Sequence, residues 1–373
     1  MTRAPAFSWV ATEAKTGRIL ADLPRFDVPS TKKSLGRYEP ASGTLPLIGA
    51  PEDWDRIMTP GATVFWLLRD NPDDPAHGIP AWGGMLIDDP RTHADSLKFA
   101  MQSIEWYFDQ RFVGDDEYVN VGQNLIVKDL VENHIAVGPN GGLPIRVQIV
   151  NGGDGKLRTR TDWKNKDDKT IYSVLRDLMG VIDGPEWTVG GEWQANPERI
   201  TPVLYVGDRI GTAVTTGLSA AAVFEMPGPV REFQRYRSYA NGKGANAVMA
   251  TSSGQGDERP ESGLVVTPDL LRPTFEHRFT PSTSIKEIDT LNAHAEGKAA
   301  TLKDGTVTLE LSAIADKAPQ LDVDWFIGDD IGYQITAPAF PNGISGTARA
   351  VGWELKPQGT AIITPILAGG DLT

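Results

Sequence analysis

The chain of 373 residues contains no cysteine and only five histidines. Without cysteine it has no disulfide, no thiolate metal ligand and no cysteine nucleophile, which also excludes a cysteine-dependent peptidoglycan peptidase. No two histidines stand four residues apart, and neither His-x-His nor His-Glu-x-x-His occurs. The sequence therefore predicts no metal site and no cofactor. The five residues are His77, His93, His134, His277 and His294.

Clusters of Lys and Arg and long apolar runs are also missing. The formal charge is −13 and the isoelectric point is near 4.9, whereas a surface that binds phosphates needs clustered cations. No segment has the apolar length of a membrane span, and the N-terminus lacks the apolar run of a signal peptide. We expect a chain that folds in a cytoplasm and does not insert into membranes. The excess of acidic residues is explained most simply by solubility. The alternative is an acidic surface that lines a conduit, along which DNA could pass without binding.

No catalytic motif is recognisable. Gly-x-Ser-x-Gly is absent, and the glycine-rich segments lack the pattern of a phosphate-binding loop. Carboxylates are too numerous to rank, although Glu105 beside Trp106 and Tyr107, or Glu186 beside Trp187, would suit a sugar cleft. The simpler interpretation is that these aromatics pack in cores while the carboxylates point outward. We expect no catalytic residue and no enzyme.

Acidic residues occur in short runs, none of which completes the Asp-x-Asp-x-Asp-Gly pattern of a calcium loop. Asp side chains in turns usually accept hydrogen bonds from the local backbone, and we predict that role here, with a bound divalent ion as the open alternative. Glu276-His277 and His294-Ala295-Glu296 are two further groups that folding could bring together. The runs are Asp70, Asp73 and Asp74; Asp88 and Asp89; Asp115, Asp116 and Glu117; Asp322 and Asp324; Asp329 and Asp330.

Tryptophan is frequent, with ten residues spread along the chain. We expect most of them to pack in cores and between subunits, because a sugar-binding platform would need two or three to converge. They are Trp9, Trp54, Trp66, Trp82, Trp106, Trp163, Trp187, Trp193, Trp325 and Trp353.

The pattern of apolar residues divides the chain into three predicted domains. Residues 1–114 are strand-like with frequent turns and predict a β-barrel, from which Val28–Ser42 makes a long polar excursion suited to subunit contacts. Residues 115–215 predict a small α/β insert. Residues 216–373 return to strands and predict a second barrel, with an exposed mobile loop near 251–263 and a helix near 284–302.

Details of the last two domains follow from spacing. One helix is predicted from Val121, Leu125, Leu130, Val131 and Ile135, and a second from Ile171, Val174, Leu175 and Leu178. Between them, 145–150 and 156–160 are predicted to pair as a hairpin through 151–155. The helix near 284–302 begins with the capping box Ser284 to Glu287 and places Ile288, Leu291, Ala295, Ala299 and Leu302 on one face.

A segment from Trp82 to Val113 combines a Trp-Gly-Gly strand, an acidic turn, an alternating strand and an aromatic segment that ends in Arg111. In this order it resembles the N-terminal barrel of tail hub proteins, the minor tail proteins of actinobacterial siphophages. Four further pieces continue the resemblance along most of the chain, each weak alone: Asp183-Gly184-Pro185-Glu186-Trp187, Asn246-Ala247-Val248-Met249-Ala250, the helix Ser284–Leu302, and Gly328-Asp329-Asp330-Ile331.

The resemblance implies a β-rich α+β fold with two tail-tube-like barrels flanking the α/β insert, assembled as a ring-shaped homotrimer like the baseplate hub of contractile-tailed phages. It implies a structural virion protein at the tail tip that joins a six-fold tube to three-fold components around the DNA exit channel. Its expected partners are copies of itself, a distal tail or tail tube protein, the tape measure protein, and tip or fibre proteins. Because the extra lysozyme or peptidase domain of some hubs is missing, cell-wall degradation is not implied.

Two alternatives remain open from the sequence. The number of tryptophans allows a tail-tip module that binds a host carbohydrate receptor. The carboxylates beside aromatics allow a tail-associated glycan hydrolase.

Overall fold

The computed structural model describes residues 7–74, 76–161, 163–181, 183–215, 218–254, 259–281 and 288–371. It contains two compact units, Met1–Phe233 with Leu311–Thr373, and Gln234–Glu310. Strands are far more numerous than helices, which confirms the predicted β-rich α+β fold. No described helix has the length and apolar character needed to cross a membrane.

The first sheet has six antiparallel strands in the order β2-β1-β5-β6-β7-β4. Its central strand β5 is buried at every position, because aromatic rings fill one face and an α/β layer covers the other. In the described part, the segment after β2 meets β4 through an isolated bridge between Asp27 and Thr44, so the sheet is strongly curved but a closed barrel is not confirmed. The strands are β1 (Phe7–Glu13), β2 (Ile19–Asp22), β4 (Pro40–Pro46), β5 (Thr63–Arg69), β6 (Ile79–Asp88) and β7 (Ser96–Ser103).

Two short helices interrupt the strand-like N-terminal region. They are α1 (Trp54–Ile57) and the 3₁₀ helix η1 (Ile104–Gln110), which holds most of the aromatic segment. Ile104 and Phe108 of η1 are buried, and they join the core between the first sheet and the α/β layer. The aromatic segment therefore anchors the next layer instead of extending the sheet.

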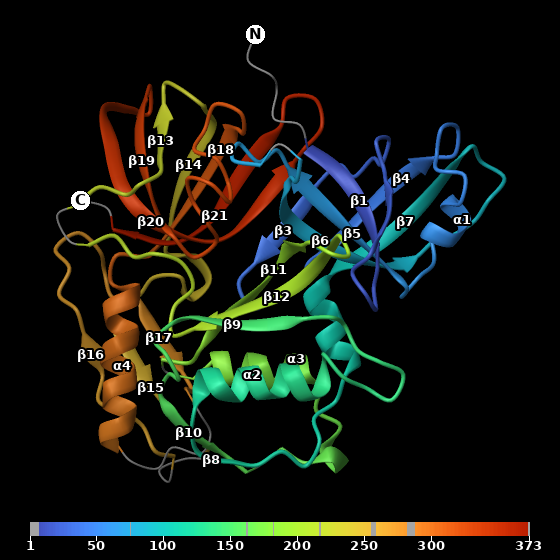
Figure 1. The fold of residues 1–373 in the computed structure, drawn as a ribbon. Coiled ribbons are helices and arrows are strands. Elements are labelled where there is room, and N and C mark those ends of the chain that lie inside the picture. Colours follow the sequence, from blue (N-terminus) through green and yellow to red (C-terminus); the bar gives the residue numbers. More distant parts are fainter. Residues whose placement is uncertain are drawn as a thin grey trace. The chain divides into compact units, whose positions relative to one another are not determined.

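The α/β layer consists of helices α2 and α3 on one face of the sheet β11-β12-β9 (Figure 1). Both predicted helices are confirmed, although Val121 lies in β8 and not in α2. In α3 the Thr170 hydroxyl accepts a hydrogen bond from the Ser173 N–H at 3.1 Å, which caps the helix. The elements are β8 (Tyr118–Gly122), α2 (Gln123–His134), β9 (Arg146–Asn151), β10 (Leu157–Arg160), η2 (Asn165–Asp167), α3 (Ile171–Met179), β11 (Glu186–Gln194) and β12 (Arg199–Gly207).

The hairpin predicted between 145–150 and 156–160 is wrong. Strand β9 pairs in parallel with β12, and β10 pairs with β8. The reason is burial: Val147 and Ile149 pack against the core under α2, whereas Leu157 of β10 stays exposed. A local turn signal cannot tell which distant strand offers the larger apolar surface.

The last sheet of this unit runs β13-β19-β20-β21-β18-β14, and β3 adds to it by pairing with β20. Strand β3 (Thr31–Ser34) belongs to the predicted excursion Val28–Ser42, so this part of the excursion contacts the C-terminal sheet of the same chain. The other strands are β13 (Val223–Met226), β14 (Val230–Ser238), β18 (Thr306–Ile314), β19 (Asp330–Ala337), β20 (Phe340–Lys356) and β21 (Ile362–Asp371).

The second unit is a small α/β fold in which α4 (Ile288–Leu302) covers the sheet β16-β15-β17. Leu291, Ala295, Ala299 and Leu302 are buried as predicted, but Ile288 is exposed, and the capping box 284–287 lies outside the described residues. The exposed loop predicted near 251–263 is wrong for Thr251, Ser252 and Ser262, which are buried; 255–258 lie outside the described residues. The remaining elements are η3 (Ala240–Gly242), β15 (Ala247–Ala250), β16 (Val265–Val266) and β17 (Glu276–Phe279).

Candidate functional site

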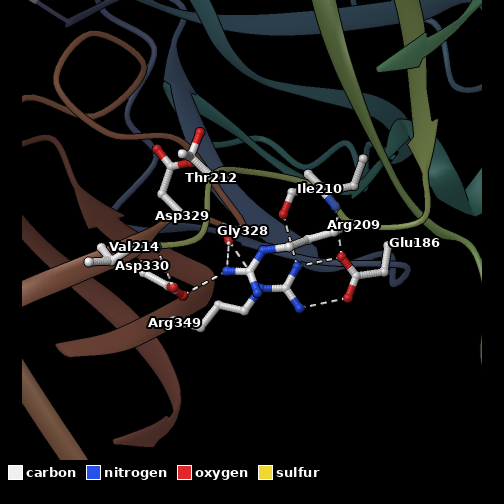
Figure 2. A network of polar contacts seen from close by, with 9 residues as sticks. All are labelled: Glu186, Arg209, Ile210, Thr212, Val214, Gly328, Asp329, Asp330 and Arg349. Atoms are coloured by element: carbon white, nitrogen blue, oxygen red, sulfur yellow. Dashed lines mark hydrogen bonds and ion pairs between the residues drawn. The ribbon is translucent and has the colours of Figure 1, made fainter. Parts of the chain in front are cut away.

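A network of polar contacts in the first unit joins the α/β layer to the last sheet, and we call it the Arg349 cluster (Figure 2). Arg349 on β20 binds both carboxylate oxygens of Glu186 at the start of β11. Its remaining donors reach two backbone carbonyls, with Nε 3.0 Å from Gly328 O and Nη2 2.9 Å from Ile210 O. A bidentate guanidinium–carboxylate pair fixes orientation as well as distance. The cluster comprises Glu186, Arg209, Ile210, Thr212, Val214, Gly328, Asp329, Asp330 and Arg349.

A second arginine extends the cluster along the same loops. Arg209 Nη2 lies 2.6 Å from Asp330 Oδ1, and Asp330 Oδ2 accepts the Val214 N–H at 2.9 Å. Asp329 Oδ1 accepts the Thr212 N–H at 2.6 Å. Both carboxylates are therefore occupied by partners from the segment that leaves β12.

Two glycines let these loops cross. A Cβ on Gly211 would lie 2.1 Å from the Gly328 carbonyl carbon, and a Cβ on Gly328 would lie 2.2 Å from Ile210 O. Both residues also have positive φ, at 79° and 95°. Any larger residue would separate the loops and break the hydrogen bonds around them.

The Arg349 cluster brings together two of the short pieces on which the family resemblance rests. Glu186 comes from Asp183–Trp187, and Asp330 comes from Gly328–Ile331. No spacing in the sequence indicates that they meet, because Arg349 supplies the link from a third position. Since the charged groups bind one another, the cluster is suited to holding two layers in register and not to acting on a substrate.

A second charged group joins the first sheet to the loop between β18 and β19, and we call it the Arg69 cluster. Arg69 on β5 is 5% exposed and donates to Leu321 O and to Gln320 Oε1. Burial raises the pKa of Asp322 to about 6, against the smaller opposing effect of the Lys33 and Arg69 charges. A partly buried carboxylate whose charge is not fully compensated lowers the stability of the folded state.

The two carboxylates that the sequence offered to a sugar cleft are both engaged. Glu105 is 3% exposed and accepts the Val189 N–H at 3.3 Å, and burial raises its pKa. Glu186 is the partner of Arg349. The expectation that these side chains point outward is wrong, because each satisfies a group between layers of the fold.

An open cleft of about 1010 Å³ is lined by residues of β1, β2 and β5, by the end of the β11–β12 hairpin and by the loop that follows β18. At its edge His77 is held between Asp74 Oδ2, 2.8 Å from Nδ1, and Glu198 Oε1, 3.2 Å from Nε2. Its lining mixes carboxylates with two cations and the half-buried Trp193, so the walls carry no concentrated charge of one sign. The lining residues include Asp22, Arg69, Asp70, Trp193, Glu198 and Lys317.

The structure tests the remaining candidate ligands. In the described ranges no group of three His, Asp or Glu residues is placed to hold a metal ion. Several acidic runs bind the local backbone as predicted: Asp116 accepts the Gly114 N–H, Asp324 the Gln320 N–H and Asp329 the Phe326 N–H. The prediction that these runs shape turns is confirmed at these positions.

All ten tryptophans lie in described segments, and none is exposed. Seven are buried and three are half-buried, which confirms core packing as their main role. A platform of exposed rings for a sugar is therefore not formed by tryptophan in this chain. The buried residues are Trp9, Trp66, Trp82, Trp163, Trp187, Trp325 and Trp353.

No protein-family model matches the sequence, and no curated protein matches it. Solved structures do match over nearly the full length. A 43 kDa tail protein of prophage MuSo2 from Shewanella oneidensis aligns with a TM-score of 0.59 at 9% identity, covering 97% of this chain and 98% of that one. A tail protein from Neisseria meningitidis MC58 aligns at 0.56 and 11% identity, covering 96% of each chain.

A third similar structure is the prophage tail protein gp18 from Listeria monocytogenes EGD-e. It aligns with a TM-score of 0.51 at 8% identity, covering 97% of this chain and 94% of that one. Agreement over whole chains at such low identity means that the fold is shared although the sequences are dissimilar. The chain therefore has the fold of phage tail proteins.

Proposed function

We propose that this chain is a structural tail protein of a phage and, more specifically, the hub at the tip of a siphophage tail. The observation that carries the proposal is the end-to-end match to the tail protein of prophage MuSo2, which leaves almost no part of either chain unaligned. The ordered motifs that resemble minor tail proteins of actinobacterial siphophages support the finer assignment.

In this proposal, three copies form a ring around the DNA exit channel, each contributing barrel domains at 1–114 and 216–373 on either side of an α/β insert at 115–215. The ring would convert the six-fold tube into three-fold tip components. The open edges of the last sheet support this ring. The sheet ends in β13 and β14, and within the described ranges neither strand has a partner on its outer side. Ring closure would cover such edges, which otherwise promote aggregation.

The charged clusters suit a part that must transmit load without changing shape. The Arg349 cluster and the Arg69 cluster each tie the last sheet to another layer of the unit. Rigid layers would let the ring hold its partners above and below. We propose as partners a distal tail or tail tube protein, the tape measure protein, and tip or fibre proteins, with DNA passing through without specific binding because the chain is acidic.

The non-enzymatic role follows the same reasoning. Glu105 and Glu186 are committed to structural contacts, and the tryptophans are withdrawn from the surface. These observations favour the structural role over a glycan hydrolase or a carbohydrate-binding module. Zymography on host cell walls should give no cleared band.

The proposal is tested on virions of the phage that encodes the chain. Antibodies raised against the purified protein should label one site at the tail tip, and a stop codon early in the gene should give particles with defective tails that the intact gene restores. A capsid protein of the same virion serves as the control for labelling. Label on the head, or normal infectious tails without the protein, would refute the assignment.

A further inference from the structure

In the second unit, a short loop that we call the Leu270 turn, residues 267–275, displays two leucines at full exposure. Leu270 is 103% exposed and Leu271 is 90% exposed. Burying a leucine side chain is favourable because it removes apolar surface from water. Two adjacent leucines that are fully exposed therefore indicate a surface that contacts another molecule. A mobile loop could carry them without consequence, but this loop is held in place.

Asn246 ties both ends of the Leu270 turn to the body of the unit. Its backbone O accepts the Thr267 N–H at 2.8 Å, its Nδ2 donates to Pro273 O at 3.0 Å, and its Oδ1 accepts the Phe275 N–H at 2.8 Å. Asn246 is itself 6% exposed. The entry to the turn and its exit are therefore fixed to the same residue, the entry by its backbone and the exit by its side chain.

Asp269 and Arg272 fix the turn from within. Asp269 Oδ1 accepts the Leu271 N–H at 2.8 Å and the Arg272 N–H at 3.1 Å. Arg272 pairs with Asp269 and stacks 4.7 Å from the centre of the Tyr239 ring. The leucines are thus presented in one conformation, which removes most of the ordering cost that a flexible loop would incur on binding.

The surroundings of the turn are apolar as well. Of the sixteen large apolar residues exposed in the described part of the chain, seven lie in the 77 residues of Gln234–Glu310. They are Tyr236, Leu264, Val266, Leu270, Leu271, Phe275 and Ile288. The fraction of the exposed large apolar residues that lies in this unit is therefore larger than the fraction of the sequence that the unit contains.

Charge indicates which partner this surface fits. Gln234–Glu310 carries nine Lys and Arg against ten Asp and Glu, a formal charge of −1, so that −12 of the −13 lies in the rest of the chain. Two copies of an acidic chain repel each other wherever their acidic surfaces meet, and the nearly neutral unit is where identical chains can approach at least electrostatic cost.

We propose that the Leu270 turn is a contact between copies of this chain, with Leu270 and Leu271 inserted into the surface of a neighbouring copy. This deepens the proposed function, on which it rests, by assigning the homotrimer a contact residue pair. Two leucine side chains that leave water on binding would stabilise such a contact in proportion to the apolar area that they bury.

The test is the oligomeric state of the full chain, measured by sedimentation velocity over a range of concentrations. The double variant Leu270→Asp/Leu271→Asp should shift the assembly toward monomer, raising the dissociation constant on the order of a hundredfold. Leu270→Ser/Leu271→Ser should weaken it without adding charge. The matched control, Ile48→Asp/Leu157→Asp, adds two charges at exposed apolar positions outside Gln234–Glu310 and should assemble as the wild type.

Three results would overturn the proposal. The first is a wild-type chain that stays monomeric at every concentration, and the second is a Leu270→Asp/Leu271→Asp variant that assembles like the wild type. The third is a Leu270→Asp/Leu271→Asp variant whose oligomers have the same mass as those of the wild type but whose melting temperature is lower. That result would mean that the leucines are covered within one chain. None of these moves the antibody label on the virion, so failure of this contact and failure of the tail assignment are distinguishable.

Discussion

Replacing Asp322 with Asn should stabilise the protein at neutral pH and leave it nearly unchanged in acid. Asp322 lies in the Arg69 cluster, where burial raises its pKa from 3.8 to about 6. A folded-state pKa above the unfolded value means that the neutral carboxyl is the form the fold prefers. The stability that this group contributes is complete below pH 3.8 and is lost as the pH rises through 6.

The size of the effect follows from the shift. A difference of two pKa units corresponds to about 3 kcal/mol in the free energy of unfolding. Asp322 is partly exposed, so solvent screening reduces this, and we expect Asp322→Asn to gain about 1 to 2 kcal/mol at pH 7.5. Asn also suits the backbone, because φ is 58° at this position and Asn tolerates the left-handed region better than most residues.

The assay is chemical denaturation of wild type and Asp322→Asn at intervals from pH 4 to 8. The difference between their unfolding free energies should be small near pH 4, grow through pH 6 and level off above it. Asp316→Asn removes one negative charge from an exposed position in the same loop and controls for net charge. A difference that is constant across this range, or an Asp322→Asn variant that is less stable at pH 7.5, would refute the reasoning.

Three further predictions concern the first unit. Arg349→Ala should lower the unfolding free energy by about 3 kcal/mol, because it removes the cationic partner of the half-buried Glu186 carboxylate and one donor from each of two backbone carbonyls, and denaturant titration measures this. Gly211→Ala should cost more than 3 kcal/mol, whereas Gly61→Ala, which has a similar φ but no atom within 4 Å of its Cβ position, should cost about 1 kcal/mol; a thermal melt that ranks them equally contradicts the crossing-loop argument. NMR titration should find the pKa of His77 above 6.5, chiefly because of its hydrogen bond to Asp74, and Asp74→Asn should bring it down. Its contribution to stability is present below pH 6.5 and is lost as the pH rises through the higher value; an unchanged titration in Asp74→Asn would show that the hydrogen bond has no effect.

The spacing of apolar residues along the sequence was sufficient to predict the elements that bury one face against a single neighbouring layer. The spacing of Ile171, Val174, Leu175 and Leu178 predicted α3 because a helix with one apolar stripe needs no other information. The return to strands after residue 216 was also predicted from local pattern, and β19 and β20 lie in that region. The turn roles of Asp324 and Asp329 also followed from local chemistry, since the hydrogen bonds from Gln320 N–H and Phe326 N–H that define these turns join residues at most four positions apart.

Pairing between distant segments was beyond such reasoning. The composition of β9 and β10 does not predict that β9 pairs with β12 and β10 with β8 instead of with each other. The pairing of β9 depends on how much apolar surface β12 and helix α2 provide for it to bury. The same holds for β3, whose polar sequence reads as a loop and becomes a strand only because the edge of β20 lies open beside it.

What the amino-acid order determined by itself was the chemistry that is possible: no thiol, no spaced histidines, few positive clusters, and many short strands separated by turns. What the tertiary structure alone decided was which charges meet. Glu186 and Arg349 are 163 residues apart, and they meet beside the point where the loops that carry Gly211 and Gly328 cross. An ion pair between two layers forms only when both layers are in the right position. Because the packing of the whole core sets those positions, no single segment of the sequence predicts the pair.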